Sequence, residues 1–311
     1  MKTSEQLIDS ILENYKSHDI TVRVGADNIV NKEILIRVME EIRKILFPGF
    51  FESNRVREEF IKYLVGERIE FIQYNLKKQI AKVLGNSSDR CGECPKSEAT
   101  KDAERVVNEF LSRIPKIRDY LYTDIEAAYE GDPAAYNTDE IIFSYPGVYA
   151  ITVYRIAHEL VLLDVPMIPR IMTEYAHSAT GIDIHPGATI GKYFFIDHGT
   201  GIVIGETTQI GDHVKIYQGV TLGALSTRRG QLMKGEKRHP TIGNRVTIYS
   251  NTSVLGGNTV IGDDVTIGGN AFIVDSIQPG TKVNVKNPEL QFSQESAPSE
   301  FVQEGFWDWV I

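Results

Sequence analysis

The chain has 311 residues, of which 42% are hydrophobic and 24% are charged, as is typical of a globular protein with a buried core. It carries 33 Lys and Arg against 42 Asp and Glu, a net charge of −9, so no overall basic field is available to hold a nucleic-acid backbone. No apolar run approaches the roughly 18 residues of a membrane span, and the first residues do not resemble a signal peptide. We expect a cytoplasmic protein with no membrane segment and no nucleic-acid partner.

Residues 1–180 have the period of α-helices. One set of aliphatic residues recurs at i, i+4, i+8 and i+11, namely Ile72, Leu76, Ile80 and Val83. The segment 85–100 is rich in Gly, Ser and charge and predicts a link between two helical layers. The segment 148–163 is apolar on nearly all sides, which predicts a helix packed between other elements, and His158 within it is interpreted as a hydrogen-bonded core residue.

The only two cysteines, Cys91 and Cys94, lie in the linking segment as Cys-Gly-Glu-Cys. A closed structural zinc site needs four ligands, so this pair supplies half of one. Two interpretations stay open. The pair forms a reversible disulfide or shares a metal, or it belongs to a polar loop without chemistry, and the second is favoured.

Past residue 180 the period changes to six. Aliphatic residues follow at this spacing in four runs: Ile184, Ile190, Ile196; Ile204, Ile210, Ile216, Leu222; Ile242, Ile248, Val254; Ile261, Ile267, Ile273. Many of them are followed directly by glycine, which suits a tight corner after a short strand. Three such units close one coil, and stacked coils bury the aliphatic side chains as a ladder. The pattern predicts a parallel β-helix, without fixing its hand.

The repeat is interrupted first at residues 197–201, Asp-His-Gly-Thr-Gly. Asp183 precedes Asp197 by less than a turn of roughly 18 residues, so the two should lie on different faces. A carboxylate that fixes the tautomer of a neutral imidazole lets it deprotonate a hydroxyl, so Asp183 and His198 predict a general-base pair that could meet across a subunit interface. The alternative is two turn-forming acids and a surface histidine.

The second interruption is the segment 224–240, ALSTRRGQLMKGEKRHP, which leaves the coil and returns. It holds five cations: Arg228, Arg229, Lys234, Lys237 and Arg238. They predict a local anion site, either for a substrate carboxylate or for the phosphates of a nucleotide-like cofactor. The alternative is a solvated loop.

Several motifs together resemble the serine acetyltransferase family. They are DIHPGATIG (183–191), IDHGTGIVIGET (196–207), VTLG (220–223) and RHP (238–240), with GDPAAYN (131–137) and YPGVYAITVYRIAHEL (145–160) upstream. The resemblance covers about residues 120–290. It implies an α+β fold, in which an N-terminal α-helical domain precedes a left-handed parallel β-helix of hexapeptide repeats. The expected domains are the helical domain at 1–180, which oligomerises and completes the serine site, the acetyltransferase domain at 181–290, and a C-terminal tail at 291–311.

The activity implied by this resemblance is transfer of the acetyl group from acetyl-CoA to the hydroxyl of L-serine. The products would be O-acetylserine and coenzyme A, as a step of cysteine biosynthesis. His198 would be the general base that takes the hydroxyl proton, and Asp183 of the DIH motif would orient it. No covalent enzyme intermediate and no metal are expected.

The resemblance also implies how serine is held. Arg238 would pair with the substrate carboxylate, while Asp132 and Asp197 would receive its ammonium group. His239 would complete the amino-acid pocket, and Glu206 would support it without touching the substrate.

Acetyl-CoA would lie in a groove between adjacent β-helices, held by backbone groups at Ala224, Ser250 and Gly269. This chain has Thr-Leu-Gly-Ala where the family commonly has Thr-Leu-Gly-Gly, so the backbone approach to the cofactor is expected to differ. Arg228 and Arg229 in the long segment 224–240 could serve the cofactor phosphates.

The partners implied by the family are a second and third copy of the chain, as a homotrimer, or as a hexamer formed by two trimers. L-cysteine would be a feedback inhibitor in the serine pocket. The terminal Ile311, after an aromatic stretch with Phe306, Trp307 and Trp309, resembles a ligand for the active site of cysteine synthase. The alternative for this tail is docking on the chain's own body.

Three other functions are weighed against this one. The first is another hexapeptide-repeat O-acetyltransferase, acting on a sugar or an antibiotic hydroxyl, which the resemblance of the helical domain disfavours. The second is a metal-dependent hydratase of the γ-carbonic-anhydrase kind, which would need three of His185, His198, His213 and His239 to converge on one zinc. The third is a non-catalytic β-helical scaffold, for which the Asp-His interruption would be needless.

Overall fold

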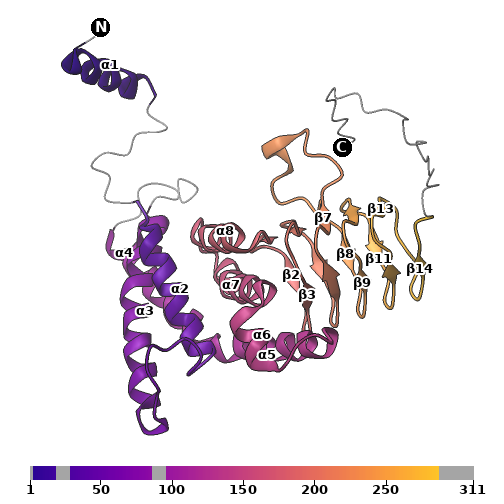
Figure 1. Cartoon of the computed structure of the whole chain (residues 1–311). Coiled ribbons are helices and arrows are strands. Elements are labelled where there is room, and N and C mark those ends of the chain that lie inside the picture. The colour runs from indigo at the N-terminus through magenta and orange to yellow at the C-terminus, as the bar shows by residue number, and fades with distance from the viewer. Residues whose placement is uncertain (1–2, 19–28, 86–95, 287–311) are drawn as a thin grey trace, which may run out of the picture.

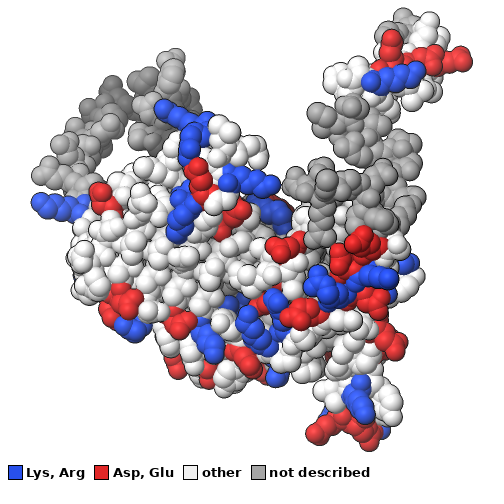
Figure 2. Space-filling view, turned by 180° about the vertical axis from the view of Figure 1, so that it is seen from behind, with Lys and Arg blue, Asp and Glu red and all other residues white. Residues whose placement is uncertain are grey.

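The computed structural model describes residues 3–18, 29–85 and 96–286 (Figure 1). Cys91, Cys94 and the tail 291–311, including Ile311, lie outside these residues. Within the described ranges, no helix has both the length and the apolar character needed to cross a membrane. Figure 2 shows acidic and basic side chains interspersed over the described part of one face, without a continuous basic surface.

The first part of the chain is helical. Its helices in chain order are α1 (Ser4–Ser17), α2 (Lys32–Leu46), α3 (Ile61–Leu84), α4 (Lys96–Ser112), α5 (Ile114–Gly131), α6 (Thr138–Ser144), α7 (Pro146–Val161) and α8 (Ile168–Thr180), with a 3₁₀ turn η2 (Glu58–Phe60) before α3. The Asn31 side chain caps α2 by accepting from the backbone N–H of Ile34 at 3.0 Å. Gly181 ends α8 with φ +71°, a conformation that favours glycine.

The predicted helical face of α3 is confirmed, because Ile72, Leu76 and Ile80 are fully buried. Helices α2, α3 and α4 form an outer layer, and α5 to α8 lie between this layer and the β-helix (Figure 1). Helix α7 is buried along most of its length, as its all-round apolar sequence predicts.

The second part is a parallel β-helix of about five coils with three sheets. The first sheet contains β1 (Asp183–Ile184), β4 (Val203–Ile204), β7 (Thr221–Gly223), β10 (Ser253–Leu255) and β13 (Phe272–Ile273). The second contains β2 (Thr189–Ile190), β5 (Gln209–Ile210), β8 (Thr241–Ile242) and β11 (Val260–Ile261). The third contains β3 (Phe195–Asp197), β6 (Lys215–Tyr217), β9 (Thr247–Ile248), β12 (Thr266–Ile267) and β14 (Lys282–Val283).

The six-residue ladder lies inside these coils. Each of its members is buried except Ile273, which is partly buried in the last strand of the first sheet. Val203 pairs with Asp183, 20 residues earlier, whereas Thr221 pairs with Val203, 18 residues earlier, so the excess at 197–201 enlarges one coil without changing the register. The expected order of a helical region followed by a parallel β-helix is confirmed.

The chain passes through the first, second and third sheets in turn, which defines corners of the coil. We call the turns from the first to the second sheet corner 1–2, and those from the third sheet back to the first corner 3–1. The segment 224–240 leaves at corner 1–2 between β7 and β8, and it contains the 3₁₀ turn η3 (Gly230–Met233). Its departure from the coil and its return were predicted from the sequence.

Helices α5 and α7 close the first coil by bonding to its outward backbone groups. Tyr154 donates its hydroxyl to the carbonyl of Ala188 at 2.6 Å, and Arg155 donates to the carbonyl of Gly191 at 2.8 Å. His158 bonds through Nδ1 to the carbonyl of Pro186 at 2.8 Å. His158 is thus hydrogen-bonded as predicted, although it is partly exposed rather than fully buried.

Candidate active site

The first group of predicted site residues lies at corner 3–1. Asp197 ends β3, and its Oδ2 atom lies 3.1 Å from Nζ of Lys215, while its Oδ1 atom lies 3.8 Å from Nε2 of His198. His198 has φ +59°, and Gly199 and Gly201 also have positive φ, so the bulge turns the imidazole outward. The His198 side chain is 73% exposed, which leaves it free to meet a substrate.

Asp132 joins this group from the helical region, where it caps the C-terminal end of α5. Its Oδ2 atom accepts from the Tyr145 hydroxyl at 2.6 Å, and its Oδ1 atom accepts from the N–H of Ala134 at 2.8 Å. These bonds, with smaller effects of Lys215 and His198, lower the pKa of Asp132. Burial and Asp132 together raise the pKa of Tyr145 to about 12, so its hydroxyl stays a donor. Corner 3–1 thus holds two carboxylates beside an exposed imidazole.

The second group lies at corner 1–2. Arg238 forms an ion pair through Nη2 with Glu206, and its backbone N–H donates to Oγ1 of Thr207 at 3.0 Å. Burial alone would raise the pKa of Glu206, but the hydrogen bond and charge of Arg238 outweigh it and leave that pKa lowered. Nη1 of Arg238 is buried and has no hydrogen-bond partner among the described residues. A buried guanidinium nitrogen of this kind can donate to the carboxylate of a ligand.

His239 follows Arg238, and its imidazole is neutral. It is 7% exposed, and burial together with Arg238 lowers its pKa to about 4, so the ring is neutral near pH 7. Its Nδ1 atom accepts the backbone N–H of Thr207 at 3.0 Å, so the neutral ring carries its proton on Nε2. The ring packs so closely on Gly205 that a Cβ there would lie 2.1 Å from its Cδ2 atom.

His185 lies at the same corner, between β1 and β2. Its Nδ1 atom accepts the N–H of Gly187 at 3.0 Å, and burial, followed by the charge of Arg170, lowers its pKa. His185 is therefore a neutral neighbour of Glu206 and His239 rather than a further cation.

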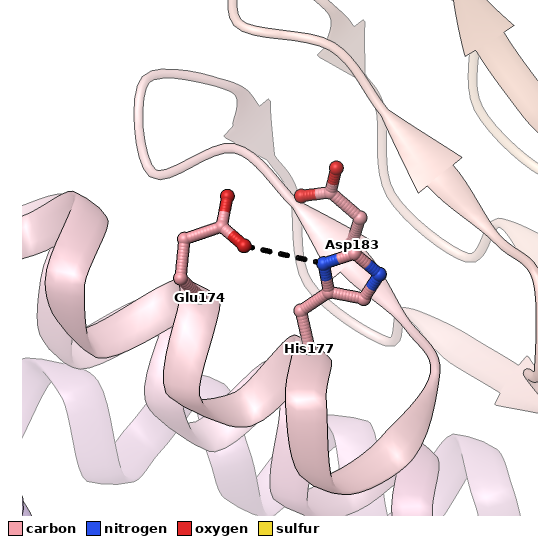
Figure 3. Close-up of side chains that lie close together, drawn as sticks. All are labelled: Glu174, His177 and Asp183. Atoms are coloured by element: carbon pink, nitrogen blue, oxygen red, sulfur yellow. Dashed lines mark hydrogen bonds and ion pairs between the residues drawn. The ribbon is translucent and has the colours of Figure 1, made fainter. Parts of the chain in front are cut away.

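Asp183 begins β1, on the outer surface of the first sheet. Its Oδ1 atom lies 3.5 Å from Nη1 of Arg170, and no hydrogen bond or ion pair joins it to His198 within the described chain. Figure 3 shows Asp183 facing His177 and Glu174 of α8, whose Nδ1 and Oε2 atoms are 3.3 Å apart. These three residues offer possible metal ligands within 4.8 Å of one another, but Arg170 pairs with both carboxylates, which explains the cluster as an ion-pair network.

The residues expected to hold acetyl-CoA fall on both corners. Ala224 follows β7 at corner 1–2, whereas Ser250 and Gly269 lie together at corner 3–1, where a Cβ on Gly269 would be 3.1 Å from the Ser250 carbonyl oxygen.

The five cations of the segment 224–240 do not form one free anion site. Arg229 pairs with Glu236, and Nζ of Lys237 donates to the carbonyl of Thr207 at 2.7 Å. Arg238 pairs with Glu206, as described above.

The two groups of site residues therefore lie on different corners of one β-helix, separated by the first sheet. Asp132, Asp197 and His198 lie together at corner 3–1, and Glu206, Arg238 and His239 lie together at corner 1–2. The histidines of the zinc interpretation are dispersed too, because His213 stacks on Tyr193 between the second and third sheets. No three of these histidines converge within the described part of one chain.

Sequence reasoning missed three residues that build the site: Tyr145, Thr207 and Lys215. Thr207 is the last residue of the motif IDHGTGIVIGET (196–207), and the coil repeat places Lys215 opposite Phe195. Tyr145 opens the motif at 145–160 and Asp132 lies in the motif at 131–137, but the six-residue repeat could not bring them together because both belong to the helical part.

Several known proteins are similar to this chain in sequence. No family model matches the chain. It is 43% identical over 259 residues to a plasmid-encoded serine acetyltransferase of Synechococcus elongatus, covering 82% of this chain and 81% of the relative. A serine acetyltransferase of Mycobacterium tuberculosis is 49% identical over 160 residues, which cover 51% of this chain and 67% of that protein.

Among solved structures, serine acetyltransferase isoform 3 of Entamoeba histolytica in complex with cysteine superposes with a TM-score of 0.70. It is 39% identical to this chain, and the match covers 83% of this chain and 84% of that one. The resemblance inferred from the motifs is thus confirmed. The chain belongs to the serine acetyltransferase family, whose members are acetyl-CoA-dependent acyltransferases.

Proposed function

We propose that the acetyl group is transferred to L-serine at a composite site, in which corner 3–1 of one subunit faces corner 1–2 of the next. The observation that carries this proposal is the separation of the two groups of site residues in one chain. His198 is exposed at corner 3–1, whereas Arg238, with its unsatisfied buried nitrogen, lies at corner 1–2 of the same chain. A cyclic trimer would complete three such sites, one at each interface.

In this site serine is held by its two charged groups. The free Nη1 donor of Arg238 pairs with the carboxylate, while Asp132 and Asp197 receive the ammonium group. Nε2–H of His239 provides one further donor, and Glu206 keeps the guanidinium in place. Serine bound at both ends exposes its hydroxyl toward the exposed imidazole of His198.

The chemistry is a direct acyl transfer. His198 takes the hydroxyl proton as the serine oxygen attacks the thioester carbonyl, and a tetrahedral oxyanion forms. The C–S bond then breaks, and His198 returns the proton to the departing thiolate, giving O-acetylserine and coenzyme A. Asp183 has no bond to His198 within one described chain, so it would orient the imidazole for both proton transfers across the subunit interface. Ala224, Ser250 and Gly269 line the acetyl-CoA groove with backbone groups, and no step requires a metal.

The test is release of free coenzyme A from acetyl-CoA, with L-serine as acceptor and a no-acceptor control. Serine-dependent release that the His198→Ala variant loses would support both the reaction and the base. Release that persists in this variant would reject His198 as the base. A folded trimer that binds acetyl-CoA but ignores serine would point to another hydroxyl acceptor.

L-cysteine is proposed as a competing ligand, because it carries the same ammonium and carboxylate groups as serine. The cysteine complex of the Entamoeba histolytica relative supports this proposal. Inhibition that rises with L-cysteine and is relieved by excess L-serine is the expected result, whereas inhibition that serine cannot relieve would contradict a shared pocket.

Binding of cysteine synthase through Ile311 remains a prediction from the sequence. Deleting Ile311 should abolish complex formation with a cognate cysteine synthase, measured by size-exclusion chromatography. An unchanged complex would reject this role for the tail.

A further inference from the structure

Lys215 is a cation at the contact between the helical region and corner 3–1. It begins β6, directly opposite Phe195 of β3, and its Nζ atom lies 4.7 Å from the ring centroids of both Phe195 and Tyr217. Its Nζ atom donates to the carbonyl of Gly131 at 2.7 Å and pairs with Oδ2 of Asp197 at 3.1 Å. A single ammonium group therefore joins the last residue of α5 to the last residue of β3.

Asp132 directly follows Gly131. The bond from Lys215 to the Gly131 carbonyl therefore fixes the backbone that carries the Asp132 carboxylate. The helix end is also tightly packed, because a Cβ at Gly131 would lie 2.7 Å from Cδ1 of Phe195. Tyr145 holds the Asp132 carboxylate from its other side. Two carboxylates from separate elements are thereby held near one another, and the positive charge of Lys215 reduces the repulsion between them.

We propose that Lys215 is a positioning residue of the serine site, which clamps the Gly131 carbonyl and the Asp197 carboxylate so that Asp132 and Asp197 face the serine ammonium together. This inference rests on the proposed function of those two aspartates. Partial burial opposes the charge of Lys215, but hydrogen bonds to Tyr217 and Asp197 raise its pKa, so the clamp is cationic at neutral pH.

A second role for Lys215 would use the same contacts, and the two roles have opposite consequences for serine binding. If Lys215 occupied the place of the serine ammonium, its removal would free the carboxylates and tighten serine binding. If it positions them, its removal lets α5 and β3 separate and weakens serine binding. The direction of the change therefore decides between the two roles.

The experiment compares Lys215→Met and Lys215→Arg with wild type in the full-length protein. For Lys215→Met we expect the serine KM to rise about tenfold, with kcat and the acetyl-CoA KM within about threefold of wild type. Lys215→Arg keeps the cation and should recover part of the loss. Lys282→Met is the matched control, because Lys282 occupies the same column of the third sheet, in strand β14 at the far end of the coils.

Three results would overturn the proposal: an unchanged serine KM, a lower serine KM, or an equal impairment of serine KM, acetyl-CoA KM and kcat.

The dissociation constant for L-serine is measured by calorimetry in parallel. If wild type binds serine but does not turn over, the calorimetric comparison still tests Lys215 while the proposed reaction fails. If wild type neither binds nor uses serine, both proposals fall. If wild type turns over serine normally and Lys215→Met leaves the serine KM unchanged, the role of Lys215 is rejected while the proposed function stands.

Discussion

Asp124 in α5 and Arg155 in α7 form a buried ion pair with an Nε–Oδ2 distance of 2.6 Å, and both side chains also bond to the first coil of the β-helix. Oδ1 of Asp124 accepts the N–H of Phe194 at 3.0 Å, and Arg155 donates to the carbonyls of Ile190 and Gly191. This ion pair thus connects helices α5 and α7 to the first coil of the β-helix.

Breaking this pair should destabilise the protein strongly. Arg155→Met leaves the Asp124 carboxylate buried without a counter-charge, and we expect the free energy of unfolding to fall by about 3–5 kcal/mol. The double variant Asp124→Asn, Arg155→Met should lose less than the single variant, because no uncompensated charge remains. Denaturant unfolding measures both. A loss below about 1 kcal/mol in Arg155→Met would contradict the role given to the pair.

Replacing His198 should remove catalysis without unfolding the protein. The side chain is largely exposed, so His198→Asn, which suits the positive φ, should keep the melting temperature while kcat falls about 10²–10⁴-fold. His213→Asn is the matched control, because His213 also has a positive φ, of +57°, but lies at a different corner, where it stacks on Tyr193. A His198→Asn variant that stays as active as wild type and the control would exclude His198 as the base.

The composite site predicts that two inactive variants restore one another. His198→Ala and Arg238→Ala each inactivate every site of a homotrimer. In randomly mixed trimers, about a quarter of the interfaces combine an intact His198 from one copy with an intact Arg238 from the next. Co-expression should therefore recover a comparable fraction of wild-type activity. Complete inactivity of the purified mixed trimers would mean that both residues act within one subunit.

His239 should make stability depend on pH. Its pKa is about 4 in the folded protein and near 6.5 when unfolded, so the unfolded state binds more protons between these values. The contribution of His239 is thus fully present above about pH 6.5 and is lost as the pH falls toward 4. The variant His239→Asn keeps an acceptor for the Thr207 N–H but cannot titrate. Its melting temperature should fall less than that of wild type between pH 7 and pH 5, and parallel curves would contradict this account.

The buried ladder of the β-helix could be predicted from the sequence. Each coil repeats the environment of the coil before it, so equivalent positions carry the same kind of side chain at a constant spacing. The same regularity located both interruptions. The join between Lys215 and Gly131 could not be predicted, because the two residues are 84 positions apart and belong to elements with different periods. The bond from Thr207 to His239 spans 32 positions and depends on where the segment 224–240 returns. Family motifs identified His239 but not the threonine that sets its tautomer.

The bonds from α7 to the first coil cover the end of the β-helix that lies next to the helical region. Without Tyr154, Arg155 and His158, the carbonyls of Ala188, Gly191 and Pro186 would form an open strand edge. Such an edge recruits strands from other chains, and end-to-end stacking of coils is the natural outcome for a β-helix. The helices therefore act as a cap at this end of the coils, which leaves the sides of the coils, where the proposed sites lie, as the surfaces open to other copies.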